Sequence, residues 1–216
     1  MKDIPMFTGQ YGLASLILKE IAVSGRAYVL VRSVWNGQTA AFLQECRDFC
    51  RAVGAETVYV SYENEDLPAV HAYDMLTMEM EKAKLPQGKP VELEPLIPEN
   101  GEVYLDIYNA CFREIIGAAS YGKQDLQRLY DKDCAFLAKV DGAYAAVAEI
   151  SEEGLESVAV LPQYRGLGYD LSLAVLPMVP RKTIRLKVAS TNRRALDLYI
   201  RLGFVKTGVA GRWWRL

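Results

Sequence analysis

A glycine-rich loop between a predicted strand and a predicted helix constrains this chain more than any other feature. Residues 155–161 are mostly apolar and favour a strand. Gln163, Gly166 and Gly168 follow with the spacing Gln-x-x-Gly-x-Gly, and a helix-like run comes next. Backbone N–H groups at a helix N-terminus face outward, the helix dipole favours an anion there, and glycines leave room for it. The sequence therefore predicts a loop that binds phosphate groups.

Two common phosphate-binding motifs do not fit this loop. No Lys-Ser/Thr pair follows the second glycine, as it would in a nucleoside triphosphate P-loop. There is no glycine two residues before Gly166 and no spaced third glycine, so the dinucleotide fingerprint is excluded as well. An ordinary glycine turn would show the same local pattern, and the loop alone does not distinguish it from an anion site.

A second strand and helix are predicted further along the chain. The apolar residues of 184–188 alternate with polar ones, which is typical of a strand. Asn192 is a good helix N-cap, and Gly203 is a good residue just past a helix end. Between them, apolar residues recur at helical spacing. The glycine loop is therefore followed by a helix, a strand and another helix.

Together these residues resemble the Gcn5-related N-acetyltransferase (GNAT) superfamily. In that family a Gln/Arg-x-x-Gly-x-Gly/Ala loop binds the coenzyme A pyrophosphate, and an Asn-x-x-Ala-x-x-x-Tyr-x-x-x-Gly-Phe segment forms the next helix. The positions that match in order and spacing are Gln163, Gly166, Gly168, Asn192, Ala195, Tyr199, Gly203 and Phe204. The resemblance covers about residues 90–216. It implies an α/β (α+β) fold in which helices flank a mixed, mostly antiparallel central sheet.

The resemblance also implies where the acyl-donor co-substrate, acetyl-CoA, would bind. In the family the pantetheine arm pairs with the exposed backbone of the strand before the loop, and the loop holds the pyrophosphate. Arg165 adds a charge that suits a phosphate, with a solvent-exposed loop arginine as the alternative. Asn192 either contacts the coenzyme or only caps its helix. The expected coenzyme-binding residues are Val158, Ala159, Val160, Gln163, Tyr164, Arg165, Gly166, Leu167, Gly168, Tyr169 and Asn192.

Three residues are candidates for proton transfer. Tyr199 matches the family position that often donates a proton to the departing thiolate, and a phenol with a pKa of about 10 suits that task; an aromatic packing residue is the alternative. Glu156 and Glu149, on consecutive strands, are candidates for accepting the proton of the amine, and a surface carboxylate is the alternative for each. Strict alternation places Glu156 on the strand face of Val158 and Val160.

The function implied by the resemblance is acetyl-CoA-dependent N-acyl transfer to a primary amine of a small molecule, by direct attack on the thioester. A protein acetyltransferase that acts on lysine or an N-terminal amine is one alternative. A non-catalytic acyl-CoA-binding module is another. The acceptor itself is not encoded in a motif.

Composition and charge narrow the partners further. Four cysteines and one histidine show no metal-ligand spacing, so no metal is expected. The net charge of −2 gives no field for nucleic acid, and Arg193, Arg194 and Arg201 are interpreted as a solvated helix face. No apolar run approaches the length of a membrane span, and no leader pattern precedes the fold. A cytoplasmic protein with no membrane partner is expected.

Proline and glycine in residues 84–90 predict a boundary between two regions. Residues 1–85 would form a small α/β region, and residues 86–216 would form the GNAT domain. The predicted element order of the second region is β-α-α-β-β-β-α-β-α-β. It includes a hairpin that turns at Asp141-Gly142.

The first region has a pattern of its own. Strands are predicted at 28–31 and 57–62, with a helix over 40–53 between them and a second helix over 64–73 before a strand at 75–80. This order is similar to the second half of a GNAT unit. A degenerate half-GNAT is one interpretation, and an unrelated α/β region is the other. The region would shape the acceptor site or form a homodimer contact.

Overall fold

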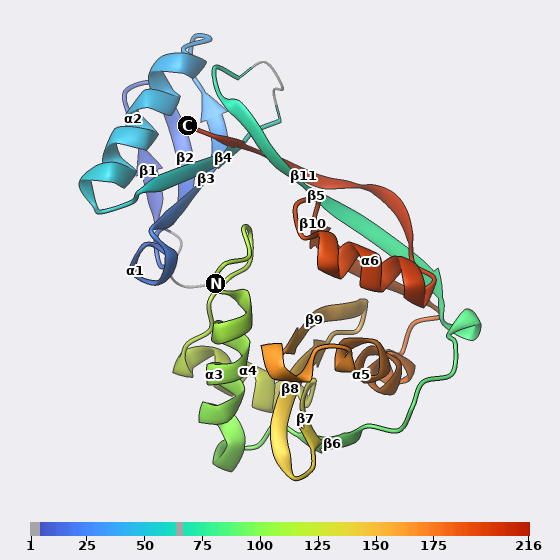
Figure 1. Ribbon diagram of the computed structural model, residues 1–216. Helices are drawn as coiled ribbons and strands as arrows, with labels where there is room; N and C mark the ends of the chain where they lie inside the picture. Colours follow the sequence, from blue (N-terminus) through green and yellow to red (C-terminus); the bar gives the residue numbers. More distant parts are fainter. Residues whose placement is uncertain (1–4, 64–66) are drawn as a thin grey trace. The chain divides into compact units, whose positions relative to one another are not determined.

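The computed structural model describes residues 5–63 and 67–216. The chain forms two compact units (Figure 1). Unit 1 contains Met1–Met75 together with Val209–Leu216, and unit 2 contains Leu76–Gly208. Each unit has its own cluster of buried apolar side chains.

This division differs from the predicted boundary at 85/86. The strands β5 (Val70–Glu81) and β11 (Val205–Arg215) each contribute residues to both units. The segment after β5 lies against unit 2, where the Lys89 backbone N–H donates to Asp170 Oδ1 at 2.9 Å. Residues 84–90 therefore belong to unit 2 instead of linking two domains.

Unit 2 follows the element order that the resemblance requires (Figure 1). Between β5 and β11 its helices and strands are β6 (Glu92–Pro95), α3 (Gly101–Phe112), α4 (Lys123–Lys132), β7 (Ala135–Val140), β8 (Ala143–Ile150), β9 (Gly154–Val160), α5 (Leu167–Val175), β10 (Thr183–Ala189) and α6 (Arg193–Leu202). The strands are ordered β11-β5-β10-β9-β8-β7-β6. Pairing is antiparallel from β6 to β9 and parallel between β9 and β10. The predicted fold class is confirmed.

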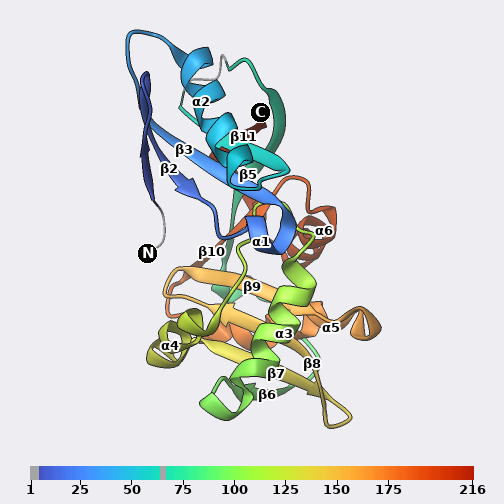
Figure 2. The same ribbon diagram turned by 90° about the vertical axis from the view of Figure 1, so that its left-hand side faces the viewer.

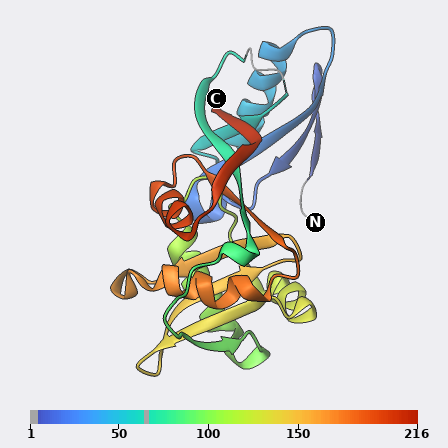
Figure 3. The same cartoon turned by 90° about the vertical axis from the view of Figure 1, so that its right-hand side faces the viewer.

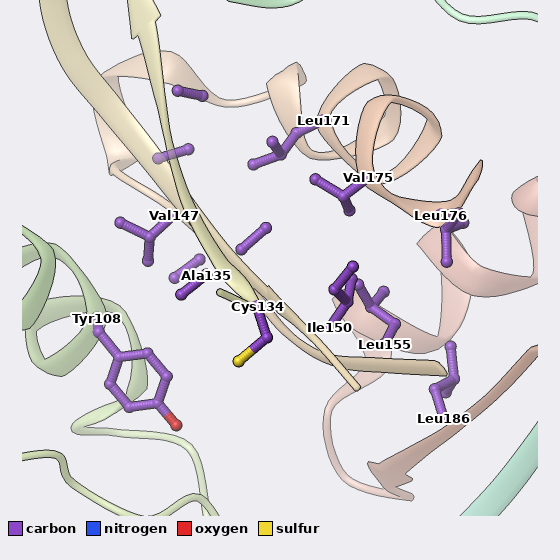
Figure 4. Close-up of a cluster of buried hydrophobic side chains, with 14 of the residues drawn as sticks. Tyr108, Cys134, Ala135, Val147, Ile150, Leu155, Leu171, Val175, Leu176 and Leu186 are labelled. Atoms are coloured by element: carbon purple, nitrogen blue, oxygen red, sulfur yellow. The ribbon is translucent and has the colours of Figure 1, made fainter. Parts of the chain in front are cut away.

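Helices cover both faces of the sheet in unit 2. Figure 4 shows Leu171 and Val175 on one side of the strands and Tyr108 on the other. Leu171 and Val175 are one helical turn apart on α5, and Tyr108 belongs to α3. Helix α5, orange in Figure 3, is short because Pro177 lies in the 3-10 turn Leu176–Met178 that follows it.

Unit 1 is a smaller α/β unit. Its elements before β5 are β1 (Met6–Thr8), β2 (Gly12–Ile17), α1 (Ile21–Ser24), β3 (Arg26–Val34), α2 (Thr39–Ala52) and β4 (Thr57–Ser61). The strands are ordered β1-β2-β3-β4-β11-β5, and β3 and β4 are parallel. Helix α2 buries Phe42, Leu43, Cys46 and Cys50 against the strands (Figure 2). The predicted strands at 28–31 and 57–62 and the helix over 40–53 are confirmed.

One predicted helix in unit 1 is wrong. Residues 64–66 of the predicted helix 64–73 lie outside the described residues, but Val70 already starts the strand β5. Leu76, Met78 and Met80 are buried in alternation, as predicted for 75–80, but the strand itself begins at Val70, so one long strand replaces a helix and a strand. The elements β1, β2 and α1 were not predicted.

Candidate functional site

The parallel strands β9 and β10 separate soon after they begin. In the described part of the chain they pair only at Gly154↔Arg185 and Leu155↔Leu186. A Cβ added to Gly154 would lie 1.7 Å from the carbonyl oxygen of Arg185, so only glycine allows this close approach. Beyond Leu155 the edge of β9 that faces β10 is open. Such an edge offers backbone N–H and C=O groups to an extended ligand.

A β-bulge lies at the start of the open edge. Ser157 pairs with Glu149 of β8 and Leu155 pairs with Ile150, which leaves Glu156 as the extra residue. The bulge breaks strict alternation at this point. The prediction that Glu156 shares a strand face with Val158 and Val160 assumed strict alternation, and the bulge removes that assumption.

The glycine loop leads from the other end of β9 into α5. Gly166 is the N-cap of α5 and has φ of +106°, a conformation that favours glycine. A Cβ added to Gly168 would lie 3.5 Å from Val160, 3.6 Å from Leu198 and 3.9 Å from Val158. Gly168 thus leaves space open beside the edge of β9. The N–H groups of the first turn of α5 have no partner within the helix and favour an anion.

A pocket of about 270 Å³, here called the arginine pocket, joins the loop to the open edge. It is lined by Cys111, Phe112, Ile115, Val158, Ala159, Val160, Arg165, Gly166, Gly168, Tyr169, Asn192, Arg194, Ala195, Leu198, Tyr199 and Arg201. Eight of the predicted coenzyme-binding residues are in this lining, together with Tyr199. Gln163, Tyr164 and Leu167 are not in it, although they belong to the same loop and first helical turn.

The arginine pocket is cationic. Three arginines line it and no carboxylate does. Arg165 comes from the loop, whereas Arg194 and Arg201 come from α6. The guanidinium of Arg201 lies 5.9 Å from the ring centroid of Tyr169. Within residues 5–63 and 67–216 none of these three arginines forms an ion pair, so their charges are available to an anion.

Sequence reasoning missed Arg194 and Arg201 as pocket residues. They were interpreted with Arg193 as one solvated face, but only Arg193 lies outside the pocket. The signal was their spacing: Arg194, Leu198 and Arg201 are at helix positions i, i+4 and i+7, on one face. Cys111, at the end of α3, also lines the pocket, and no sequence signal indicated this.

Tyr199 and Asn192 both line the arginine pocket from α6. Tyr199 is 8% exposed, and burial raises the pKa of its hydroxyl to about 12, so the phenol keeps its proton at neutral pH. Asn192 Oδ1 accepts a hydrogen bond from the Ala195 backbone N–H at 3.2 Å, which confirms the predicted N-cap. The cap fixes the start of the helix that carries Tyr199.

Glu149 and Glu156 lie in a second pocket of unit 2, of about 820 Å³, here called the carboxylate pocket. It is lined by Tyr121, Arg128, Lys132, Asp133, Cys134, Glu149, Ile150, Ser151, Glu152, Glu153, Glu156, Met178 and Pro180. Five of these side chains are carboxylates and two are cationic. The two pockets share no residue, but β9 contributes Glu156 to one and Val158 to the other.

The two candidate carboxylates have different surroundings. Glu149 is 3% exposed; its Oε1 accepts from Arg128 at 2.8 Å and its Oε2 accepts from the Tyr121 hydroxyl at 2.7 Å. Burial, followed by the nearby charges and hydrogen bonds, raises the pKa of Tyr121, so its hydroxyl remains a donor. Glu156 is exposed and forms no ion pair with any described residue. Of these two carboxylates, Glu156 is therefore the one that no described residue engages in an ion pair.

In the described ranges, no group of three His, Cys, Asp or Glu side chains could hold a metal ion. All four cysteines are free thiols, and burial raises the pKa of Cys50 to about 11. Among the same residues no helix is long and apolar enough to cross a bilayer.

The divergent parallel strands, the glycine loop and the helix that follows define a class of acyl-transfer fold. Residues 102–204 match the family model described as the acetyltransferase (GNAT) family. The chain therefore contains a GNAT acetyltransferase domain, and the chemistry of this family is acyl transfer. A comparison with curated proteins gives no match.

Solved structures with the same fold cover almost the whole chain. A functionally unknown conserved protein from Staphylococcus epidermidis has a TM-score of 0.62 and 16% identity, covering 100% of this chain and 94% of its own. A GNAT-family acetyltransferase from Colwellia psychrerythraea has a TM-score of 0.55 and 16% identity, covering 97% and 83%. A tandem GNAT protein from the clavulanic acid biosynthesis pathway has a TM-score of 0.55 and 15% identity, covering 95% and 78%. At these identities the likeness shows the fold alone.

Proposed function

We propose that unit 2 transfers an acetyl group from acetyl-CoA to a primary amine of a small molecule. The observation that carries this proposal is the continuity of the arginine pocket with the open edge of β9. A ligand with phosphates at one end and a polar, extended arm at the other would fit, with the phosphates in the cationic pocket and the arm along the open edge of β9. Acetyl-CoA has this form, and it supplies the acyl group as a thioester.

In this proposal, different residues of the arginine pocket bind different parts of the coenzyme. The first turn of α5, with Gly166 and Gly168, accommodates the pyrophosphate, and Arg165 adds a neutralising charge. The backbone of Val158 and Val160 pairs with the amide groups of the arm, as an added strand would. The empty space at Gly168 fits this role, because a side chain there would project toward Val158 and Val160. Gln163, Tyr164 and Leu167 would support the loop from behind.

Tyr199 and Glu156 carry the proton transfers in this proposal. The amine nitrogen attacks the thioester carbon, and the carbon–sulfur bond breaks. Tyr199, still protonated at neutral pH, gives its proton to the departing sulfur and regains one from solvent. Glu156 accepts the proton of the amine through water. Backbone N–H groups beside the bulge are available to the oxyanion.

The carboxylate pocket is the proposed acceptor site. It lies beside the same strand as the arginine pocket, because β9 contributes Glu156 to one and Val158 to the other. Its volume of about 820 Å³ is in the range of small-molecule sites. The excess of carboxylates favours a cationic amine over an anionic acceptor. Glu149, which is held by Arg128 and Tyr121, acts as a positioning residue for this wall.

Unit 1 is proposed to be a degenerate half-GNAT unit. Strand β3, helix α2 and parallel strand β4 reproduce the order of β9, α5 and β10. Its role would be structural, in shaping the protein around the acceptor or in a homodimer contact. Size measurement in solution at several protein concentrations tests the dimer.

The test of this function is thiol release from acetyl-CoA in the presence of a panel of amines. We expect turnover with a small primary amine, and a large loss in Glu156→Gln but not in Glu99→Gln. Glu99 is the matched control, because it is an exposed carboxylate of unit 2 that lines neither pocket. Turnover with peptide amines alone would favour a protein acetyltransferase. Coenzyme binding without turnover on any amine would favour a non-catalytic binding module.

A further inference from the structure

We propose that Lys132 is an acceptor in its own active site, so that the protein acetylates itself at the side-chain nitrogen of this lysine. This inference rests on the proposed function, since it uses the same acyl donor and the carboxylate pocket. It assigns a modification site at the end of α4. It also predicts acetyl transfer within one molecule when no amine is added.

Lys132 lies in the pocket that is proposed to take the acceptor. It is the last residue of α4 and lines the carboxylate pocket. Among the described residues that line the two pockets of unit 2, it is the only lysine. Glu156, the proposed proton acceptor, lines the same pocket. The chain therefore supplies a primary amine of its own to this pocket.

The helix directs the Lys132 side chain toward the pocket wall. Helical side chains lean back over the preceding turn, which brings Lys132 next to Arg128, four residues earlier. Arg128 also lines the pocket and donates to Glu149 Oε1 at 2.8 Å. Burial raises the pKa of the Cys134 thiol on the pocket wall, and the charge of Lys132 is one of those that lower it. The ammonium group is thus close enough to the wall to act on it.

The backbone at Lys132 is held in place at the pocket. Asp133 ends α4 with φ of +46°, and its N–H donates to the Tyr130 carbonyl oxygen at 3.2 Å. The Cys134 carbonyl oxygen accepts from the Ile150 N–H at 2.9 Å. These bonds fix the base of a flexible four-carbon stem beside the pocket.

The charge of Lys132 is not committed to a partner in the described residues. Arg128, the other cation of the pocket lining, is paired with Glu149 at 2.8 Å. Lys132 is exposed and forms no ion pair with any described residue, although Asp133 and Glu152 line the same pocket. Its ammonium group can therefore move to the acceptor position without breaking an ion pair.

The chemistry is that of the proposed function, with Lys132 as the amine. Its ammonium group gives one proton to Glu156 through water, and Nζ attacks the thioester carbon of acetyl-CoA. A second proton leaves the nitrogen as the carbon–sulfur bond breaks, and Tyr199 protonates the departing sulfur and regains a proton from solvent. The products are acetyllysine, the coenzyme as a free thiol and one released proton. The modification removes one of the two positive charges in the pocket lining.

The test is incubation of the full chain with acetyl-CoA and no added amine, followed by mass spectrometry of the intact protein and its peptides. Wild-type protein should gain one acetyl group, at Lys132, at a rate per molecule that does not change on dilution. Lys123 is the internal control, because it lies on the same helix and its side chain is 83% exposed. Lys132 should react at least about tenfold faster than Lys123, since it is held beside the donor.

Two variants separate transfer by the enzyme from chemical acetylation. Gly168→Glu, which fills the coenzyme site, and Glu156→Gln, which removes the proton acceptor, should both leave Lys132 unmodified. Glu99→Gln should keep the wild-type rate, because Glu99 is exposed and lines neither pocket. A small amine that the protein acetylates should slow the reaction of Lys132, because both compete for one site.

The outcomes separate this inference from the proposed function. Turnover of a small amine without any acetylation of Lys132 would overturn the inference and leave the acetyltransferase proposal standing. Equal rates at Lys132 and Lys123, or acetylation of Lys132 that persists in Gly168→Glu, would show chemical acetylation and overturn it as well. A rate per molecule that rises with protein concentration would place the reaction between molecules and contradict the assignment. Acetyl-CoA that is bound but never consumed, with or without amines, would refute the proposed function and this inference together.

Discussion

The two units contain the same strand–helix–strand arrangement, but in the described residues the parallel strands of that arrangement separate only in unit 2. In unit 1 the parallel strands β3 and β4 pair at five positions, from Arg26↔Thr57 to Leu30↔Ser61. In unit 2 the parallel strands β9 and β10 pair at two positions and then separate. An added strand can bind only where the backbone is unpaired. This difference is the reason for proposing the coenzyme site in unit 2 and not in unit 1.

The loops that follow β3 and β9 also differ, in the number and position of their glycines. The unit 1 loop has Gly37 as its single glycine and leads into α2 at Thr39. The unit 2 loop places Gly166 at the N-cap of α5 and Gly168 beside the open edge. Without the second glycine, a side chain would occupy the position that is empty at Gly168. The comparison teaches that the shared strand–helix–strand order is not sufficient for a binding site. The separation of the parallel strands and the two glycines of the loop are needed as well.

The largest effect is expected at the point where β9 and β10 separate. Gly154→Ala should lower the free energy of unfolding by at least about 3 kcal/mol, because the new Cβ would lie 1.7 Å from the Arg185 carbonyl oxygen. Urea unfolding followed by tryptophan fluorescence measures this loss. Gly208→Ala is the control, since a Cβ there meets no atom within 4 Å. Equal stability of the two variants would contradict the close strand approach.

The next effect concerns the proton donor. Tyr199→Phe should reduce kcat at least about a hundredfold while acetyl-CoA binding is kept, because only the hydroxyl is removed. Steady-state thiol release and calorimetry on the same preparation separate the two quantities. Tyr144→Phe should keep full turnover, since its hydroxyl bonds Glu94 at 2.8 Å, outside both pockets. If Tyr199→Phe turns over normally, Tyr199 is a packing residue.

A smaller effect is expected in the glycine loop. Gly168→Ala should weaken acetyl-CoA binding about tenfold or more, because the methyl group fills the space beside Val158 and Val160. Stability should not fall, since the new contacts of 3.5–3.9 Å are ordinary and alanine suits a helix better than glycine. Gly37→Ala in unit 1 is the matched control, and it should leave the affinity for acetyl-CoA unchanged. Weaker binding in Gly37→Ala would mean that unit 1 takes part in the site.

The smallest effect is expected at the start of α6. Asn192→Ala should cost about 1 kcal/mol of stability, because the Ala195 N–H loses its side-chain acceptor. Asn192→Asp should restore most of this loss, since aspartate caps equally well. Thermal unfolding of the three proteins measures the series. A loss of coenzyme affinity in Asn192→Asp as well as in Asn192→Ala would show that the amide also contacts the ligand.

The sequence predicted most of unit 2 because its signals are local. The hairpin at Asp141-Gly142 and the cap at Asn192 each depend on neighbouring residues, and each is present. The bulge at Glu156 was not predictable in this way, because it is a property of how β9 pairs with β8. That the exposed residues Arg194 and Arg201 line the arginine pocket likewise depends on what lies beside α6.

Unit 1 was predicted less well for a related reason. The strand β5 was divided into a helix and a strand, because its regular alternation of buried side chains begins only at Leu76, whereas the strand begins at Val70. The C-terminal residues 209–216 were assigned to the second region by their position in the chain. In the structure Trp214 pairs with Val60 of β4 and joins the core of unit 1. Such long-range pairing leaves no trace in a local pattern.

The most direct test of the contrast between the units is the stoichiometry of acetyl-CoA binding. Calorimetric titration of the full chain, with desulfo-CoA and ATP as controls, gives both the affinity and the number of sites. We predict one site per chain with micromolar affinity, abolished by Gly168→Glu and unaffected by Gly37→Ala. Two sites, no binding, or a site that survives Gly168→Glu would contradict the assignment of the coenzyme to the open edge of β9.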